Sequence, residues 1–301
     1  MPPDMHKLTP PVRRQFEEDA GDDGAAGGKD PLDEGGCMPA PGLIRRYENR
    51  ALVLATHNCF VKCGFCNRRF FVGGERGRLD VDVDAALGYV AANPEIKEVL
   101  VSGGDPLTLG DDELAGILER IRAIDHVRII RLGTRSPMAE PGRISRPLVD
   151  MLLRFMPLVV SVHFNHGDEL GERPRAAVRL LVEAGISVLN QSVLLRGVND
   201  DAGVLSDLCW KLAEAGVRPY YLFQCERVKG TSGFWVPLDR GIGIAGNLRR
   251  SLPGHAVPHF VVDLPGLDGK AWIDPANPPQ RADGGYSLTG SSGSRVFYPD
   301  R

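Results

Sequence analysis

Three cysteines are the residues of this chain with the clearest chemistry. Cys59, Cys63 and Cys66 form a C-x3-C-x2-C motif, and no fourth cysteine lies close to them in the sequence. A [4Fe–4S] cluster usually takes one thiolate per iron, so three local ligands would leave one iron open to a small molecule. The motif therefore predicts a cluster that binds a ligand and acts on it.

Two other uses of these cysteines stay open on the motif alone. Structural zinc usually takes two cysteine pairs, or a cysteine pair with a histidine pair, and here only His57 is near enough to complete a Cys3His set. A disulfide is disfavoured because the cysteines are few for the chain length and no secretory signal is evident. We therefore favour the cluster.

The composition is that of an ordinary globular protein. Hydrophobic residues make up 43% of the 301 residues, charged residues make up 25%, and the net charge is −3. There is no basic excess that would favour nucleic acid, and no apolar stretch is long enough to span a membrane. We expect a cytoplasmic protein, in a compartment that keeps thiols reduced, whose partner is a small molecule.

Short apolar runs alternate with amphipathic stretches along most of the chain. We expect buried strands at 51–56, 97–102, 127–132, 158–163, 187–193, 219–224 and 259–263. Helix-like segments at 82–93, 111–124, 146–156, 174–185 and 205–216 lie between them. This alternation predicts parallel strands with crossover helices. The expected fold class is therefore α/β, as an open or partial (β/α)6 barrel.

We expect the barrel to occupy residues 41–275. Residues 1–40 are rich in Gly, Asp and Glu and poor in large apolar side chains, so we expect an arm that is mobile or draped on the surface. Cys37, which lies in this arm, is interpreted as an incidental thiol. Residues 276–301 include a Gly/Ser-rich stretch and should form a short extension packed on the surface.

Polar residues gather at the predicted carboxyl ends of the strands, where parallel (β/α) folds carry their reactive groups. The cysteine loop follows the first strand, and later ends carry Ser102-Gly103-Gly104-Asp105, Gly133-Thr134-Arg135, His163-Phe164-Asn165-His166, Asn190-Gln191 and Gln224-Cys225-Glu226. Each group alone has an ordinary explanation, such as a tight turn or a hydrogen-bonded core side chain. Their common placement favours one shared site.

Lys270 ends a glycine-containing loop after the last apolar strand. Such a loop can turn a lysine back into the barrel, where desolvation would lower its pKa and let it form a Schiff base with a carbonyl compound such as pyridoxal phosphate. From the loop alone, an exposed lysine is the more ordinary interpretation. The pattern leaves both open.

Taken together, these motifs resemble those of the lysine 2,3-aminomutase family of radical S-adenosylmethionine enzymes. C-x3-C-x2-C with an SGGD strand end is the superfamily signature. The family resemblance rests on further blocks in the same order: PGLIRRYENR, CNRR, LGTRSP, HFNH, NQSVLLRGVND, RPYYLFQC, VPHFVVDLPG and the GK that ends at Lys270. The resemblance extends over residues 30–297.

The resemblance implies three cofactors and assigns residues to each. Cys59, Cys63 and Cys66 would bind the [4Fe–4S] cluster. The positions that match contacts to S-adenosylmethionine are Ser102, Gly103, Gly104, Asp105, His163 and Gln191. Lys270 matches the catalytic lysine that binds pyridoxal 5′-phosphate, and Arg46, Tyr47 and Arg50 form an RY-x2-R segment associated with the same cofactor, where guanidinium groups suit a phosphate.

The resemblance also implies an isomerase. A radical formed from S-adenosylmethionine would remove a hydrogen atom from the β-carbon of an amino acid, and the α-amino group would move to that carbon. Arg68 matches the catalytic-site arginine that grips the α-carboxylate of the substrate. Asp263 matches one of the two aspartates that the family places at the distal ammonium group of the substrate. Glu226 stands at the position where the second aspartate is expected. Two carboxylates favour a substrate with a cationic side chain. Because glutamate is one methylene longer than aspartate, Glu226 would suit a substrate with a shorter side chain or a repacked pocket.

Further expectations follow from the same resemblance. The electron donor would be a flavodoxin or a ferredoxin, and a homo-oligomer is compatible with the family. The family's C-terminal zinc cysteines are absent, and Asp201 stands where another zinc cysteine is expected, so intersubunit zinc is not expected. Two alternatives remain: a radical enzyme of the same scaffold with a different outcome or a protein-bound lysine substrate, and a non-catalytic iron–sulfur or zinc protein.

Overall fold

Nine strands form one curved sheet in the computed structural model, which describes residues 7–17, 27–72, 81–274 and 276–300. In order across the sheet they are β1 (Leu43–Tyr47), β2 (Arg50–Thr56), β3 (Glu98–Gly103), β4 (Ile129–Thr134), β5 (Leu158–Val162), β6 (Ser187–Leu194), β7 (Arg218–Gln224), β8 (His259–Asp263) and β9 (Lys270–Trp272). β2 to β8 are parallel, and the antiparallel β1 and β9 form the edges. The predicted α/β partial barrel is confirmed, with the predicted strands as its parallel part.

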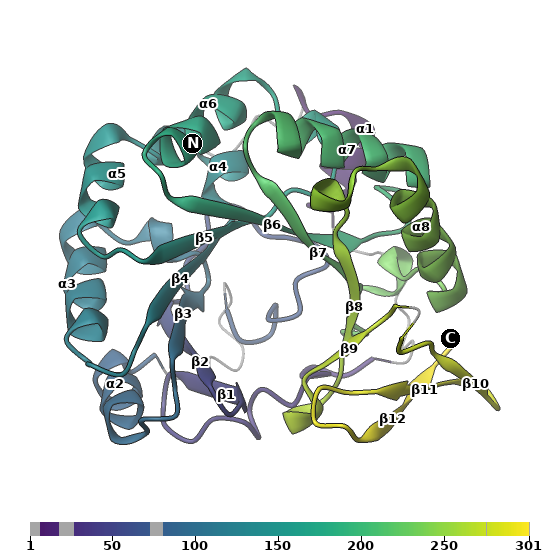
Figure 1. Ribbon diagram of the computed structural model, residues 1–301, viewed down its shortest axis with the longest axis horizontal. Coiled ribbons are helices and arrows are strands. Elements are labelled where there is room, and N and C mark those ends of the chain that lie inside the picture. Colours follow the sequence, from purple (N-terminus) through teal and green to yellow (C-terminus); the bar gives the residue numbers. More distant parts are fainter. Residues whose placement is uncertain (1–6, 18–26, 73–80, 275, 301) are drawn as a thin grey trace.

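Helices surround the outer face of this curved sheet (Figure 1). They are α2 (Val83–Ala92), α3 (Asp111–Arg122), α5 (Arg146–Leu153), α6 (Glu172–Glu183), α7 (Ala202–Glu214) and α8 (Leu238–Ser251), with the short α1 (Pro10–Arg14) and α4 (Ser136–Ala139). Each predicted helix is present, but α8 was not predicted. Its glycines lower helix propensity, and burial of Leu238, Ile244 and Leu248 stabilises it instead.

Local signals in the sequence explain where two of these helices begin. The Asp82 carboxylate accepts a hydrogen bond of 2.9 Å from the N–H of Ala85 at the start of α2. The Asp201 carboxylate accepts bonds of 2.8 and 3.1 Å from the first N–H groups of α7. Such caps satisfy N–H groups that have no partner within the helix. Asp201, which replaces an expected zinc cysteine, therefore has a structural role as a helix cap.

The strands alternate between the core under the helices and the inside of the barrel. In β3, Val99 and Val101 are fully buried in the main hydrophobic cluster, whereas Leu100 and Ser102 line the interior cavity. The alternation follows from the two-residue period of a strand. Each strand thus contributes both to stability and to the wall of the cavity.

The described parts of the first forty residues pack against the mouth of the barrel. Gln15 is completely buried, and its carbonyl accepts a hydrogen bond of 2.8 Å from the N–H of Gly64 in the cysteine loop. The Leu32 carbonyl accepts one of 2.9 Å from the N–H of Gly266, near Lys270. The prediction of a mobile or surface-draped arm did not anticipate these contacts, because each partner lies far away in the sequence.

The C-terminal residues form a second, antiparallel sheet of β10 (Gln280–Ala282), β11 (Gly285–Thr289) and β12 (Arg295–Pro299), which lies beside β9 in Figure 1. Tyr286 and Leu288 are almost fully buried. The turn after β11 brings the Ser291 hydroxyl within 3.3 Å of the Lys270 N–H. Within the described residues, no helix is both long and apolar enough to cross a membrane.

Candidate active site

One cavity of about 650 Å³ lies inside the curved sheet and is lined by residues of all nine strands. It is lined by every residue to which the family resemblance assigns a role: Arg46, Tyr47, Arg50, Cys59, Cys63, Cys66, Arg68, Ser102, Gly103, Gly104, Asp105, His163, Gln191, Glu226, Asp263 and Lys270. Of the other strand-end residues, Asn165, His166, Asn190, Gln224 and Cys225 do not line it. The expectation that these residues share one site agrees with this placement. Their individual roles stay predictions.

The start of the cysteine loop is held by the end of β3. Gly104 and Asp105 donate backbone hydrogen bonds of 2.7 Å each to the carbonyls of Thr56 and Asn58. A side chain at Gly104 would place its Cβ 2.1 Å from the Asn58 oxygen, and Gly103 has a φ of +121°. The two glycines therefore permit a close approach of two backbones, which fixes the loop that carries the cysteines.

Asp105 is a structural centre within this region. Its carboxylate accepts hydrogen bonds from the Thr134 hydroxyl at 2.7 Å, the Arg135 N–H at 2.8 Å and the Ser136 hydroxyl at 3.1 Å. Burial raises the pKa of this carboxyl, while these bonds favour its charged form. The bonds tie the end of β3 to the end of β4, so Asp105 positions the cavity wall around the cysteine loop.

The cysteine thiols lie where a cluster would stabilise their charged form. Burial and then repulsion from the neighbouring thiolates raise the pKa of Cys59 and of Cys66 to about 12. Deprotonation at neutral pH would therefore accompany metal binding. None of the six cysteines forms a disulfide. Three thiols on one cavity wall are a donor set that fits an iron–sulfur cluster.

The zinc alternative finds no matching geometry in the described residues. No three His, Cys, Asp or Glu side chains there gather closely enough to hold a single metal ion. A cluster differs in this respect, because it presents its irons at separate corners and needs its thiolates spread around it.

His163 is a neutral side chain at the edge of the cavity. Burial and then the nearby positive charge of Arg135 lower its pKa to about 3. Asn165 Oδ1 accepts a hydrogen bond from the Val193 N–H and lies 3.1 Å from His163 Nε2. Because this oxygen can only accept, His163 Nε2 carries the proton and Nδ1 is an acceptor for a ligand.

Lys270 faces Asp263 across a tight hairpin formed by β8 and β9. The two residues are direct cross-strand partners, and Lys270 Nζ lies 2.9 Å from Asp263 Oδ1 and 3.4 Å from the Tyr47 hydroxyl. Burial lowers the pKa of Lys270, but the attraction of Asp263 and Tyr47 outweighs it, so the net shift is upward. The lowered pKa expected from burial alone is therefore wrong for this arrangement.

Arg46 joins the two edges of the sheet. Its Nε donates to the Gly266 carbonyl at 3.0 Å, and its Nη2 donates to the carbonyls of Leu264 and Gly269. These bonds hold the hairpin that carries Lys270, so Arg46 is less available to a phosphate than predicted. Arg50 instead stacks 3.6 Å from the centre of the Tyr47 ring and lines the cavity.

Arg68 is held by a residue that was not predicted, Glu34. Arg68 Nε and Nη2 donate to the two carboxylate oxygens of Glu34 at 2.7 and 2.6 Å. Both side chains are largely buried. The pair uses one side of the planar guanidinium. Within the described residues the end formed by Nη1 and Nη2 has no other hydrogen-bond partner, so it offers a second fork that can bind another carboxylate.

Glu226 lies in an acidic part of the cavity. Burial and then the negative charge of Asp263 raise its pKa to about 8, while the nearby Lys270 acts in the opposite direction. The raised pKa reflects the cost of a second buried carboxylate charge beside Asp263, which the nearby Lys270 offsets only in part. A cationic group placed between these two carboxylates would favour the charged form of Glu226.

Sequence reasoning missed Gln15 and Glu34 and gave Arg135 and Glu169 no role. The first two lie in a segment whose composition gave no sign of burial, and each contacts a partner distant in the sequence. Arg135 was placed at a strand end and stands in the LGTRSP block. Its position was therefore a signal, but its contacts depend on the tertiary fold.

Comparison with known proteins decides the family. The Radical SAM superfamily profile matches residues 53–208. A putative L-lysine 2,3-aminomutase of Aquifex aeolicus is 41% identical over 276 residues, which are 91% of this chain and 74% of the relative. The chain belongs to the lysine 2,3-aminomutase family. Membership in the radical SAM superfamily implies a [4Fe–4S] cluster and S-adenosylmethionine.

Other members of this family differ in their named substrates. The L-lysine 2,3-aminomutase of Acetoanaerobium sticklandii is 43% identical over 248 residues, covering 82% of this chain and 60% of the relative. The glutamate 2,3-aminomutase of Clostridioides difficile is 37% identical, with coverages of 82% and 58%. The chain thus spans about 60% of the length of the first curated relatives.

A solved structure supports the fold independently. Streptococcus suis SuiB bound to S-adenosylmethionine superposes with a TM-score of 0.53, over 71% of this chain and 50% of SuiB. The sequences are 13% identical, so this similarity concerns the fold alone.

Proposed function

We propose that this protein is a 2,3-aminomutase that moves the α-amino group of a basic amino acid to the β-carbon, with pyridoxal phosphate as a further cofactor. One observation carries the proposal. The cysteine loop, Lys270 and the carboxylates Glu226 and Asp263 line the same cavity. A radical rearrangement of a bound amino acid requires its reacting carbon to lie between a radical source and the group that holds the nitrogen.

The residues of the chain would divide the work of binding and orientation. When bound, the cluster with S-adenosylmethionine would supply the hydrogen-abstracting radical, and pyridoxal phosphate would hold the migrating nitrogen. Lys270 would give up its contact with Asp263 to hold pyridoxal phosphate, and Arg50 would bind the phosphate group. The free fork of Arg68 would bind the α-carboxylate. Aromatic rings around Lys270 Nζ, including Phe223 at 5.2 Å, would exclude water.

The charges of the cavity support a basic substrate. Once Lys270 is engaged, Asp263 and Glu226 would lack a cation, and a substrate ammonium group would replace it. An acidic side chain would instead meet two carboxylates. Among the described residues that line the cavity, Lys270 is the only lysine. The proposal therefore favours lysine or a shorter basic amino acid over glutamate.

An anaerobic substrate screen tests the activity. Reconstituted, reduced protein is incubated with S-adenosylmethionine, pyridoxal phosphate and each of the common amino acids plus ornithine, and products are separated by chromatography and mass spectrometry. We expect a β-amino isomer of unchanged mass from a basic amino acid. A product of altered mass would refute the aminomutase assignment and support a different radical reaction on this scaffold.

Two measurements address the cofactors separately. Lys270→Ala should abolish the borohydride-reducible absorbance of bound pyridoxal phosphate, whereas Lys229→Ala, which removes an exposed lysine, should retain it. Equal absorbance in parent and Lys270→Ala would contradict the role of Lys270.

Metal analysis after anaerobic reconstitution should find iron and sulfide. Zinc without iron would instead favour a non-catalytic metal protein.

A further inference from the structure

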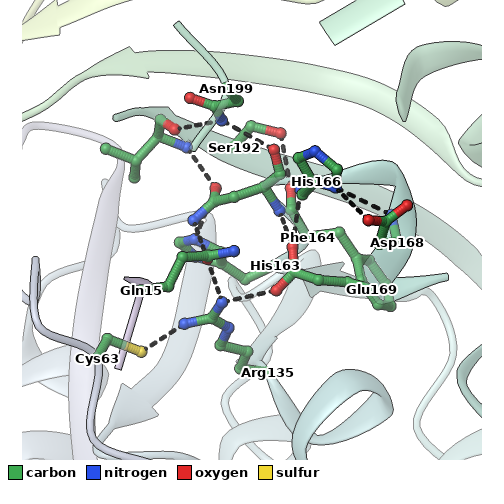
Figure 2. A network of polar contacts seen from close by, with 12 residues as sticks. Gln15, Cys63, Arg135, His163, Phe164, His166, Asp168, Glu169, Ser192 and Asn199 are labelled. Carbon is green, nitrogen blue, oxygen red and sulfur yellow. Dashed lines mark hydrogen bonds and ion pairs between the residues drawn. The ribbon is translucent and has the colours of Figure 1, made fainter. Parts of the chain in front are cut away.

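Arg135 makes a direct contact with one of the cluster cysteines. Its side chain leaves the end of β4 and runs toward the cysteine loop, where Nη1 lies 2.7 Å from the sulfur of Cys63 (Figure 2). The guanidinium is buried, with 8% of the side chain exposed. A cationic donor beside a thiolate sulfur favours negative charge on that sulfur.

Two further residues hold this guanidinium in place. Arg135 Nη2 donates to Glu169 Oε1 at 2.8 Å and to Gln15 Oε1 at 2.6 Å, as Figure 2 shows. Gln15 also accepts a bond of 2.9 Å from Asn165, and Glu169 also accepts one of 2.8 Å from the His166 N–H. The direction of Arg135 toward the sulfur is therefore set by residues from two separate segments.

The surroundings of Arg135 strengthen its electrostatic effect. The rings of Phe16 and Phe65 lie 4.9 and 5.4 Å from the guanidinium carbon. These rings and the burial keep water away, so the charge of Arg135 is less screened at the sulfur than a surface charge would be. Glu169 offsets part of that charge, but Arg135 lies between Glu169 and Cys63, so the cation is the nearer group.

We propose that Arg135 is a positioning residue of the cluster, which places a fixed positive charge at the Cys63 sulfur and makes the cluster easier to reduce. This inference rests on the proposed function, because it assumes that Cys63 is a cluster ligand. Reduction adds one electron from an external donor to the cluster and makes its net charge more negative. A fixed positive charge at a ligand sulfur therefore favours the reduced form, which is the form that cleaves S-adenosylmethionine.

Redox titration of a charge-balanced variant tests the inference. Arg135→Gln combined with Glu169→Gln removes both buried charges and leaves no unpaired ion. The midpoint potential of the reconstituted cluster is followed by electron paramagnetic resonance. We expect the ratio of reduced to oxidised cluster at a fixed potential to fall about tenfold, which is about 59 mV for one electron.

A surface pair provides the matched control. Arg154 and Glu119 form an ion pair at 2.5 Å with more than half of each side chain exposed. Arg154→Gln combined with Glu119→Gln makes the same chemical change away from the cavity and should leave the potential unchanged. The inference is overturned if the buried double variant loads a full cluster and keeps the parent potential. A parent that binds no iron and sulfide would overturn the proposed function itself.

A measurement on the unmutated protein covers the case in which the variant does not fold. Parent protein is labelled with ¹⁵N at the guanidino nitrogens of arginine, and the reduced cluster is studied by pulsed electron paramagnetic resonance. We expect a weak ¹⁵N coupling from an arginine beside a ligand sulfur. Arg135→Lys, which keeps the charge, should lose this coupling. Absence of any arginine coupling in the parent would refute the contact.

Discussion

The pair formed by Glu34 and Arg68 allows a quantitative test of how the N-terminal segment supports the cavity. Glu34→Gln keeps the size of the side chain but removes its charge. The side chain of Glu34 is 5% exposed and that of Arg68 is 16% exposed. Removing one partner of a buried ion pair typically costs about 3–5 kcal/mol. Because glutamine still offers one acceptor, we expect the low end, a loss of about 3 kcal/mol in the free energy of unfolding.

Another pair in the same protein is the matched control. Arg45 and Glu95 are 2.7 Å apart, but the Glu95 side chain is 39% exposed. Glu95→Gln makes the same substitution in a more hydrated place and should have a much smaller effect. Anaerobic urea denaturation of the cluster-loaded proteins, with both circular dichroism and cluster absorbance as probes, gives the comparison.

The two variants also separate stability from substrate binding. If Glu34 orients Arg68 for the α-carboxylate, Glu34→Gln should raise KM for the amino acid more than it lowers kcat. Glu95→Gln should change neither. Equal losses of stability in both variants would show that Glu34 is not a buried partner of Arg68, and the reasoning about the mouth of the barrel would be wrong.

Three further predictions concern single residues. The pKa of Glu226 is raised from 4.5 to about 8, so between these pH values the folded state keeps a proton that the unfolded state releases. The free energy of unfolding should therefore fall as the pH rises from about 4.5 to about 8. Denaturation curves of Glu226→Gln should show a smaller fall over the same pH range. Gly269→Ala should destabilise the protein more than Gly284→Ala in thermal melts, since both have positive φ but only Gly269 lacks space for a Cβ. Asp201→Ala should cost about 1 kcal/mol in urea denaturation through loss of the α7 cap.

The general architecture of the site was predictable because parallel strands bring their carboxyl ends together. Residues as distant as Cys59 and Glu226 could be assigned to one site from strand order alone, and they line the same cavity. The prediction needed only local patterns, namely apolar runs and the polar residues that follow them.

Contacts between distant segments could not be predicted in the same way. No local pattern indicates that Glu34 meets Arg68 or that Gln15 meets Arg135, since such pairs depend on how loops cover the barrel. The direction of the Lys270 pKa shift could not be predicted either. Burial lowers this pKa and the neighbouring Asp263 raises it, and only the geometry shows which effect is larger.

Under the proposed function, the direct pairing of Asp263 with Lys270 makes the register between β8 and β9 important for activity. In a strand, side chains alternate sides at every residue, so a shift of this register by one residue would move the lysine amine to the opposite face. The cysteine loop lies outside this hairpin and would keep its place. If the protein works as proposed, such a variant would still form its radical but would not hold the migrating nitrogen.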